Sequence, residues 1–176
     1  MSTTNGHSTK AKEAWQEISD WQRENKYILG GYRPEQADYK AILASLTFAH
    51  NETCNVYTHL IGALLLPLVA TATMQYLGEP RFLNVMSMDY FVFGAFFSCA
   101  EVCLVLSTLF HLMGCHSYPA EQFWHGMDML GIIICIVGTF FSGINFIFLC
   151  EEGLQYVHWG IVSSPSDTCS RFRCSE

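Results

Sequence analysis

The sequence has 176 residues, of which 51% are hydrophobic and only 14% are charged, against roughly 25% charged residues in typical soluble domains. The net charge of −7 provides no basic surface, which argues against nucleic acid as a partner. The eight cysteines include no C-x-x-C pair, which argues against a thiolate zinc knuckle or a thioredoxin-type redox motif. The composition instead favours a membrane protein.

Residues 1–54 are predicted to form an N-terminal tail outside the hydrocarbon layer. Within this tail, residues 35–50 carry apolar side chains such as Ile42 and Leu46 at helical spacing. This pattern predicts a short amphipathic helix that lies along the membrane surface. Six of the nine Lys and Arg residues precede residue 41, and an excess of basic residues favours a cytosolic N-terminus.

Three long apolar segments follow the tail, and each is long enough to cross a hydrocarbon core of about 30 Å. They cover residues 56–77, 90–113 and 127–150. Because backbone groups in lipid must bond internally, each segment is predicted to be an α-helix. We therefore expect an all-α transmembrane bundle of three spans over residues 55–150, with short loops and a C-terminal tail over 151–176. Buried helices of a soluble protein are the alternative, and so short a chain has too little polar sequence to cover them.

Small and polar residues follow one face of the third span at a period of about 3.5 residues. They are Asp128, Gly131, Cys135, Gly138, Ser142 and Asn145. Such a stripe allows a neighbouring helix to approach closely, but helix packing alone does not explain an acidic residue at its start. In the second span, Ser107 and His111 are one turn apart on one face. Glu101 lies in the middle of the same span and is given no role.

Polar residues of all three spans are expected to lie at one level of the membrane. The second span ends near His111 where the third begins near Asp128, so both side chains are expected near the same membrane surface. Glu52, Asn55 and His59 share one face at the start of the first span. A histidine that faces a carboxylate is one half of a metal site or of a proton-handling pair. The alternative is an imidazole that only anchors its helix at the interface.

Four segments in the correct order resemble motifs of the progestin and adipoQ receptor family, which includes adiponectin receptors and haemolysin III-related proteins. The segment from His50 to Leu60 resembles the E-x-x-N-x-x-x-H signature of that family. Ser107 to His111 is similar to its second-helix motif, and Phe123 to Gly131 is similar to the start of its third helix. The segment Tyr27 to Pro34 resembles the Y-I-x-x-G-Y-R-P lead-in of fungal members. The resemblance covers roughly residues 27–150.

The resemblance implies a seven-helix fold with a cytosolic N-terminus and a zinc ion near the cytosolic side. In the family, zinc is held by the histidine that matches His111 and by an H-x-x-x-H pair on the seventh helix. The aspartate that matches Asp128 holds a zinc-bound water. Related alkaline ceramidases resemble amide hydrolases, and zinc lowers the pKa of its water to about 7. The resemblance thus implies Asp128 as a catalytic base and Ser107 as a supporting polar group.

The sequence departs from the family pattern after residue 150. Four more spans are expected there, but a polar stretch follows over residues 163–171. His158 is followed four residues later by Val162, so the H-x-x-x-H pair is missing, whereas zinc needs about three protein ligands. His116 and His125 are disfavoured as substitutes because loop histidines are usually solvated. We therefore expect a C-terminally truncated family member without stoichiometric zinc.

The expected function is that of a multi-pass protein of the plasma membrane or an endomembrane. Its role would be receptor-like, in lipid signalling or in lipid and zinc homeostasis, with membrane lipids around it and a lipid or sphingolipid as its ligand. One alternative is a zinc-dependent ceramide-type amide hydrolase. Another is a non-catalytic fragment that associates with a full-length homologue.

Overall fold

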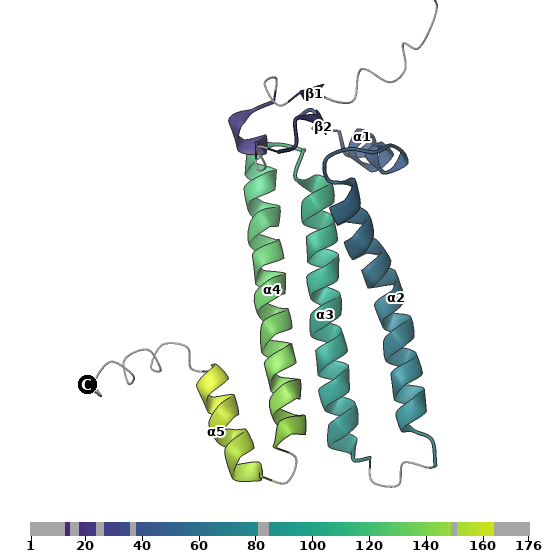
Figure 1. Ribbon diagram of the computed structural model, residues 1–176, viewed down its shortest axis with the longest axis vertical. Helices are drawn as coiled ribbons and strands as arrows, with labels where there is room; N and C mark the ends of the chain where they lie inside the picture. Colours follow the sequence, from purple (N-terminus) through teal and green to yellow (C-terminus); the bar gives the residue numbers. More distant parts are fainter. Residues whose placement is uncertain are drawn as a thin grey trace, which may run out of the picture. The chain divides into compact units, whose positions relative to one another are not determined.

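Three long helices dominate the computed structural model, which describes residues 13–14, 18–23, 27–35, 38–80, 85–148 and 151–163 (Figure 1). They are α2 (Thr53–Leu77), α3 (Ser87–Met113) and α4 (Tyr118–Ile147). Each is long and apolar enough to cross a membrane. The predicted all-α fold with three spans is therefore confirmed. Of the basic residues counted above, Lys10, Lys12, Lys26 and Arg81 lie outside the described residues, as do the last two residues of the third predicted span and the stretch beyond 163.

Helix α4 begins at Tyr118, well before the predicted start at residue 127. The second and third predicted spans left a loop over residues 114–126, and this prediction was wrong because most of that stretch is helix. Ser117 precedes the first turn, and its carbonyl oxygen accepts from the N–H of Glu121 at 2.9 Å. Pro119 in the first turn supports the start, since its missing N–H has no helical partner there and its fixed φ suits a helix.

The N-terminal segment forms short elements that pack on the protein itself. Strands β1 (Glu13–Ala14) and β2 (Gly30–Tyr32) pair antiparallel, and η1 (Asp20–Gln22) lies between them in the chain. Helix α1 (Tyr39–Ala44) continues into η2 (Ser45–Thr47). The predicted helix over 35–50 is thus shorter than expected.

Ile42 of α1 is turned into the protein, whereas Tyr39 and Leu43 of the same helix are exposed. Ile42 is only 1% exposed and forms a buried cluster with Val56, Leu112 and Cys115. This cluster joins α1 to the start of α2 and the end of α3. It belongs to the first of two compact units, which comprises Met1–Ala63 and Leu104–Leu130.

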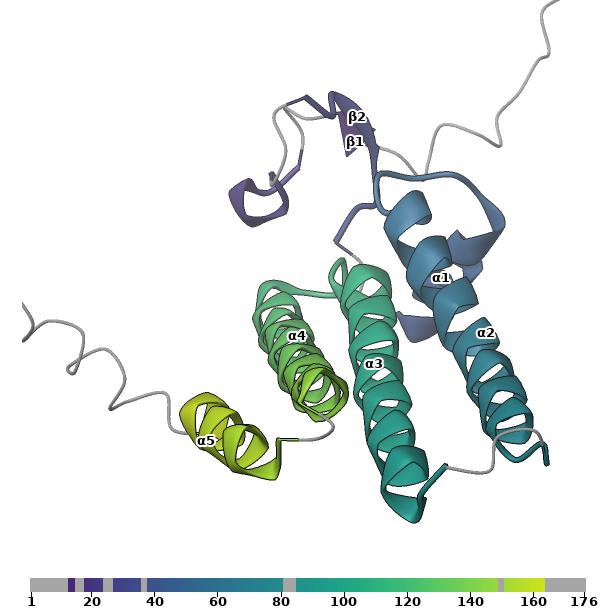
Figure 2. The same cartoon turned by 60° about the horizontal axis from the view of Figure 1, so that its bottom comes forward.

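In the second unit, Leu64–Cys103 and Gly131–Glu176, helices α3 and α4 pack closely (Figure 2). A Cβ placed on Gly138 would lie 2.6 Å from the Cβ of Cys99. The Ser142 hydroxyl donates to the carbonyl oxygen of Val92 at 3.3 Å, and also to that of Gly138 within its own helix. The stripe predicted on the third span was expected to allow close approach of a neighbouring helix. Gly138 and Ser142 of this stripe contact α3 in this way.

A further helix, α5 (Glu152–Ser163), lies in the region predicted only as a tail. Its Trp159 stacks on Phe141 of α4, with ring centroids 5.0 Å apart and planes inclined by 21°. Gln155 Nε2 donates to the carbonyl oxygens of Asn145 and Phe148 at 3.2 and 2.8 Å. Gln155 thereby caps carbonyl groups at the C-terminal end of α4, which have no partner within the helix.

Candidate functional site

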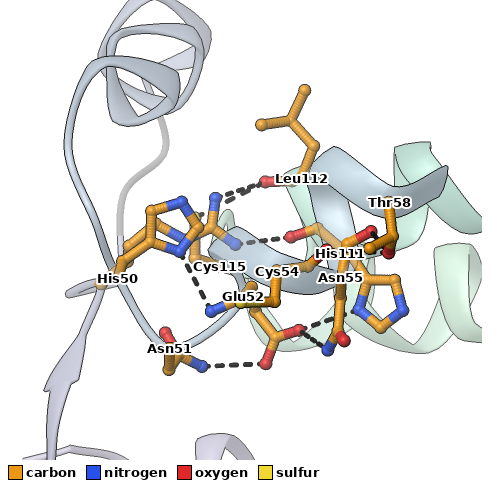
Figure 3. A network of polar contacts seen from close by, with 10 residues as sticks. His50, Asn51, Glu52, Cys54, Asn55, Thr58, His111, Leu112 and Cys115 are labelled. Carbon is orange, nitrogen blue, oxygen red and sulfur yellow. Dashed lines mark hydrogen bonds and ion pairs between the residues drawn. The ribbon is translucent and has the colours of Figure 1, made fainter. Parts of the chain in front are cut away.

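The centre of the candidate site, in the first unit, is the pair formed by His111 and Glu52 (Figure 3). His111 lies in the last turns of α3, and its Nδ1 is 2.9 Å from Oε2 of Glu52, just before α2. Both side chains are 18% exposed. An ionised carboxylate only accepts hydrogen bonds, so His111 carries a proton on Nδ1. When the imidazole is neutral, its Nε2 then has a free lone pair.

The Glu52 carboxylate is held by further hydrogen bonds from its own chain segment. Asn51 Nδ2 donates to Oε1 at 2.9 Å, and Asn55 Nδ2 donates to Oε2 at 2.8 Å (Figure 3). Burial alone raises the pKa of Glu52, but the hydrogen bonds from His111 and Asn55 and the positive charges nearby outweigh burial. The pKa of Glu52 is therefore lowered, and the carboxylate is ionised at neutral pH.

The pairing of His111 differs in one respect from the prediction. We expected its carboxylate partner to be Asp128 across the hairpin of the second and third spans, whereas the residue that bonds it is Glu52. Glu52 is 59 positions away in the sequence. The E-x-x-N-x-x-x-H face of the first span thus supplies the carboxylate, because the start of α2 and the end of α3 lie side by side in this unit.

His59 and Asp128 lie close to this pair and bring two unsatisfied atoms. The ring of His59 stacks on that of His111, with centroids 5.5 Å apart and planes inclined by 30°. His59 is close enough to His111 and Asp128 for their charges to act on it. Nδ1 of His59 and Oδ1 of Asp128 are both buried without a hydrogen-bond partner. Buried polar atoms of this kind are costly and require an explanation, such as a bound ion or water.

The other predicted polar residues of α3 are divided between the two units. Ser107 is 5% exposed and lies one turn before His111, in the first unit with the pair. Glu101 belongs to the second unit, where its Oε2 is buried without a hydrogen-bond partner. The structure therefore places Ser107 in the same unit as the His111–Glu52 pair and Glu101 in the other unit.

Arg33 is a residue of the site that the sequence analysis did not identify as functional. It is 5% exposed, and its guanidinium reaches the end of α3. Nη2 donates to the carbonyl oxygen of His111 at 2.6 Å, and Nη1 donates to that of Leu112 at 2.9 Å and to Ser45 Oγ at 3.2 Å. Burial lowers the pKa of Arg33, while the charges of Cys115 and Glu52 act in the opposite direction. Its position between Tyr32 and Pro34, in the lead-in motif, was the only available signal.

An open cavity of about 50 Å³ adjoins the pair. Charged and aromatic side chains from four parts of the chain line it, including Trp21, Arg33, Glu52, Phe110, His111 and Glu121. All of them belong to the first unit. The His111–Glu52 pair is therefore partly buried yet open to a polar ligand.

The donor types suit zinc, but their number is too small for a complete site. His111 offers an imidazole whose other nitrogen bonds a carboxylate, as is usual for metal-binding histidines, and Asp128 offers an unpaired oxygen. No group of three or more His, Cys, Asp or Glu residues placed to hold a metal occurs within the described ranges. His116 bonds Ser117 Oγ, and His125 is 55% exposed beside Glu121. A zinc ion here needs ligands beyond the described residues.

Apolar helices of membrane-spanning length, with polar side chains gathered at a partly buried centre, define a multi-pass helical membrane protein. The chain belongs to the haemolysin-III related family, whose model matches residues 47–166. This finding confirms the resemblance stated from the motifs.

Relatives in several organisms carry names of the same receptor class. The chain is 34% identical over 172 residues to the ADIPOR-like receptor IZH2 of Saccharomyces cerevisiae, covering 93% of this chain and 53% of that protein. It is 30% identical over 149 residues to the adiponectin receptor protein of Drosophila melanogaster, covering 85% and 33%. It is 28% identical over 145 residues to human progestin and adipoQ receptor family member 3, covering 82% and 46%. The chain spans about a third to a half of the length of these relatives.

Proposed function

We propose that this protein has a receptor-like role in lipid signalling or in lipid and zinc homeostasis, centred on His111. The observation that carries the proposal is the partly buried polar cluster of Glu52, His59, His111 and Asp128 in a family of membrane proteins. Ionisable groups within membrane spans are costly and mark functional sites. The names of the relatives, among them an ADIPOR-like receptor and an adiponectin receptor, support the receptor-like role.

We infer that the N-terminus faces the cytosol and that the protein resides in the plasma membrane or an endomembrane. The basic residues before residue 41 support this orientation. Resistance of the full chain to alkaline carbonate extraction tests the membrane association, and release into the supernatant would contradict it. Protease access to the N-terminus in sealed microsomes tests the orientation.

For zinc, we propose that His111 coordinates through Nε2 and that Asp128 acts through a water. The hydrogen bond from His111 Nδ1 to Glu52 supports this assignment because it leaves Nε2 as the ligating nitrogen. Bound zinc would act as a Lewis acid. Within the protein, Glu52 orients the imidazole and Asp128 offers an acceptor to a water.

A zinc titration of the purified chain in detergent, labelled with ¹⁵N-histidine, tests this assignment. We expect the chain as purified to hold less than one zinc per molecule, and added zinc to shift the Nε2 signal of His111. His111→Gln removes that signal, and Asp128→Asn weakens the response. His125→Gln, at an exposed position, is the matched control. A His111 signal that does not respond to zinc contradicts the proposal.

Amide hydrolysis of a ceramide-like lipid is a second candidate function. The observation in its favour is the unpaired Oδ1 of Asp128, since a carboxylate that lacks a partner is free to accept a proton from water. Ser107, buried one turn from His111, is the supporting polar residue. Release of fatty acid from ceramide that is lost in Asp128→Asn but kept in His125→Gln supports this function, and equal rates contradict it.

Association with a full-length homologue is a further candidate. The most apolar 18 residues of α2 include none that is buried, whereas 28% of the corresponding 18 residues of α4 are buried. An apolar helix with so much exposed surface has either lipid or another helix as its neighbour. Co-purification of the tagged chain with a full-length homologue at stoichiometric amounts supports the association.

A further inference from the structure

Arg33 and Glu52 hold the same histidine from two sides. Arg33 donates to the backbone carbonyl oxygen of His111 at 2.6 Å, while Glu52 accepts from the ring of His111 at 2.9 Å. Arg33 precedes α1 and Glu52 precedes α2, so two segments far from α3 in the sequence converge on one of its residues.

The bonds made by Arg33 close the end of α3. The last carbonyl groups of a helix have no partner within it, and here those of His111 and Leu112 accept from one guanidinium. A cation at this end also interacts favourably with the helix dipole. The helix ends at Met113, only two residues after His111, so fraying of the last turn would directly move the imidazole.

Burial makes this contact hard to replace. Arg33 is 5% exposed, and Ser45, which it also bonds, is 2% exposed. Glu52 is near enough for its charge to act on Arg33. Removal of the guanidinium would take a donor from one buried and one partly buried carbonyl group, leaving the Leu112 carbonyl with the weak contact from Cys115 Sγ at 3.9 Å, and would take a positive charge away from Glu52.

We propose that Arg33 is a positioning residue that fixes the last turn of α3, and with it the imidazole of His111 against Glu52. The inference rests on the proposed function of His111 but names a residue outside the E-x-x-N-x-x-x-H segment. It assigns to the lead-in segment before α1 a direct part in the geometry of the site.

The tautomer of His111 reports the position of its ring without any metal. We would record ¹⁵N spectra of the full chain in detergent, labelled with ¹⁵N-histidine, and assign His111 by its loss in His111→Gln. The wild type is expected to show the tautomer with the proton on Nδ1. In Arg33→Gln, the ratio of this tautomer to the other is expected to fall by about tenfold, as for loss of a charge-assisted hydrogen bond. Glu52→Ala, which removes the acceptor itself, should produce the same change.

Controls separate positioning from general stability. Arg23→Gln removes another arginine of the N-terminal segment, one that bonds Asp20 and the carbonyl of Ile18, and should leave the His111 signals unchanged. Arg33→Lys keeps the charge but lacks the planar fork that reaches both carbonyls, so it should restore the wild-type tautomer only in part. If Arg33→Gln does not fold, Arg33→Lys alone provides the test.

Two results would overturn the inference. One is a His111 spectrum that is unchanged in Arg33→Gln. If Arg33→Gln does not fold, an unchanged His111 spectrum in Arg33→Lys has the same meaning. The other is a wild type without the Nδ1-protonated form. A tautomer that depends on Arg33 in a protein whose His111 does not respond to zinc refutes the zinc proposal and supports the positioning role.

Discussion

Gly138 of α4 faces Cys99 of α3 so closely that a Cβ on Gly138 would lie 2.6 Å from the Cys99 Cβ and 2.7 Å from its Sγ. Real side chains do not approach to this distance, so Gly138→Ala must push the two helices apart. We expect a loss of about 1–3 kcal/mol in unfolding free energy. The midpoint of thermal unfolding in detergent measures it.

Two variants make the Gly138 prediction specific. Gly143 lies on the same helix with nothing within 4 Å of its Cβ position, so Gly143→Ala should be neutral or stabilising because alanine favours helix. Cys99→Gly removes the opposing Cβ and Sγ and should recover part of the loss in the double variant. Equal losses at Gly138 and Gly143 would show that the contact is not tight.

Stability at alkaline pH should depend on Cys115. Burial raises the pKa of its thiol above the ordinary value of 9.0, and the charge of Arg33 only partly opposes this. As the pH rises above that ordinary value, the unfolded chain loses the proton first, so the unfolding free energy falls. Below it the contribution is fully present. Cys115→Ala should be less stable at neutral pH, but its stability should fall less steeply above pH 9 than that of the wild type.

Chemical denaturation between pH 7 and pH 10 measures this slope. Cys54 is exposed, so Cys54→Ala serves as the control and should keep the wild-type slope. In the native protein, maleimide should label Cys54 faster than Cys115 because Cys54 is exposed, whereas Cys115 is buried and burial raises the pKa of its thiol. Equal labelling rates would show that Cys115 is accessible.

The contact between α5 and α4 should depend on Trp159. Its ring stacks on Phe141, and its Nε1 donates to the Phe141 carbonyl oxygen at 3.4 Å. Trp159→Ala should cost about 0.5–1.5 kcal/mol from the lost ring pair, beyond the loss of buried area. Faster hydrogen exchange over residues 152–163 measures the release of α5. Val157→Ala, at a position 57% exposed, should leave the exchange rates unchanged.

The start of α3 should depend on Asp89. Its Oδ2 accepts from the N–H of Met86 at 2.8 Å, while its own N–H donates to the Met86 carbonyl oxygen at 3.0 Å. This reciprocal pair satisfies groups that the first turn leaves without partners, so Asp89→Ala should cost about 1 kcal/mol. Hydrogen exchange should rise in the first turn of α3. Ser98→Ala, whose hydroxyl bonds only the carbonyl of Gly94 among its recorded partners, should show no such local change.

The three spans were predictable because their apolar length is a property of the local sequence. The residues at which the helices begin and end were less predictable. The start of α4 was missed because the span was bounded by its apolar residues and Glu121, Gln122 and His125 are polar, although Ser117 followed by Pro119 marks a helix start. Helix α5 was missed because its stability comes from contacts with α4, such as that of Trp159 with Phe141, which no local pattern reveals.

The sequence indicated which residues lie near one another in the candidate site better than it indicated which of them form hydrogen bonds. Helical periodicity correctly indicated that Glu52 and His59 share the level of His111. Periodicity does not determine which of two carboxylates reaches an imidazole, because that depends on how three helices rotate against one another. Arg33 was missed since its two bonds to α3 go to backbone carbonyls, which every residue has and which therefore leave no trace in the sequence.

The docking of Arg33 also limits how α3 can adapt to bilayers of different thickness. One more turn would require the carbonyl oxygens of His111 and Leu112 to accept from N–H groups four residues further along, on the side where the guanidinium now lies. In a thicker bilayer, lengthening of α3 at this end therefore competes with the bonds to Arg33, and part of the mismatch falls on a smaller tilt or on local thinning of the lipid.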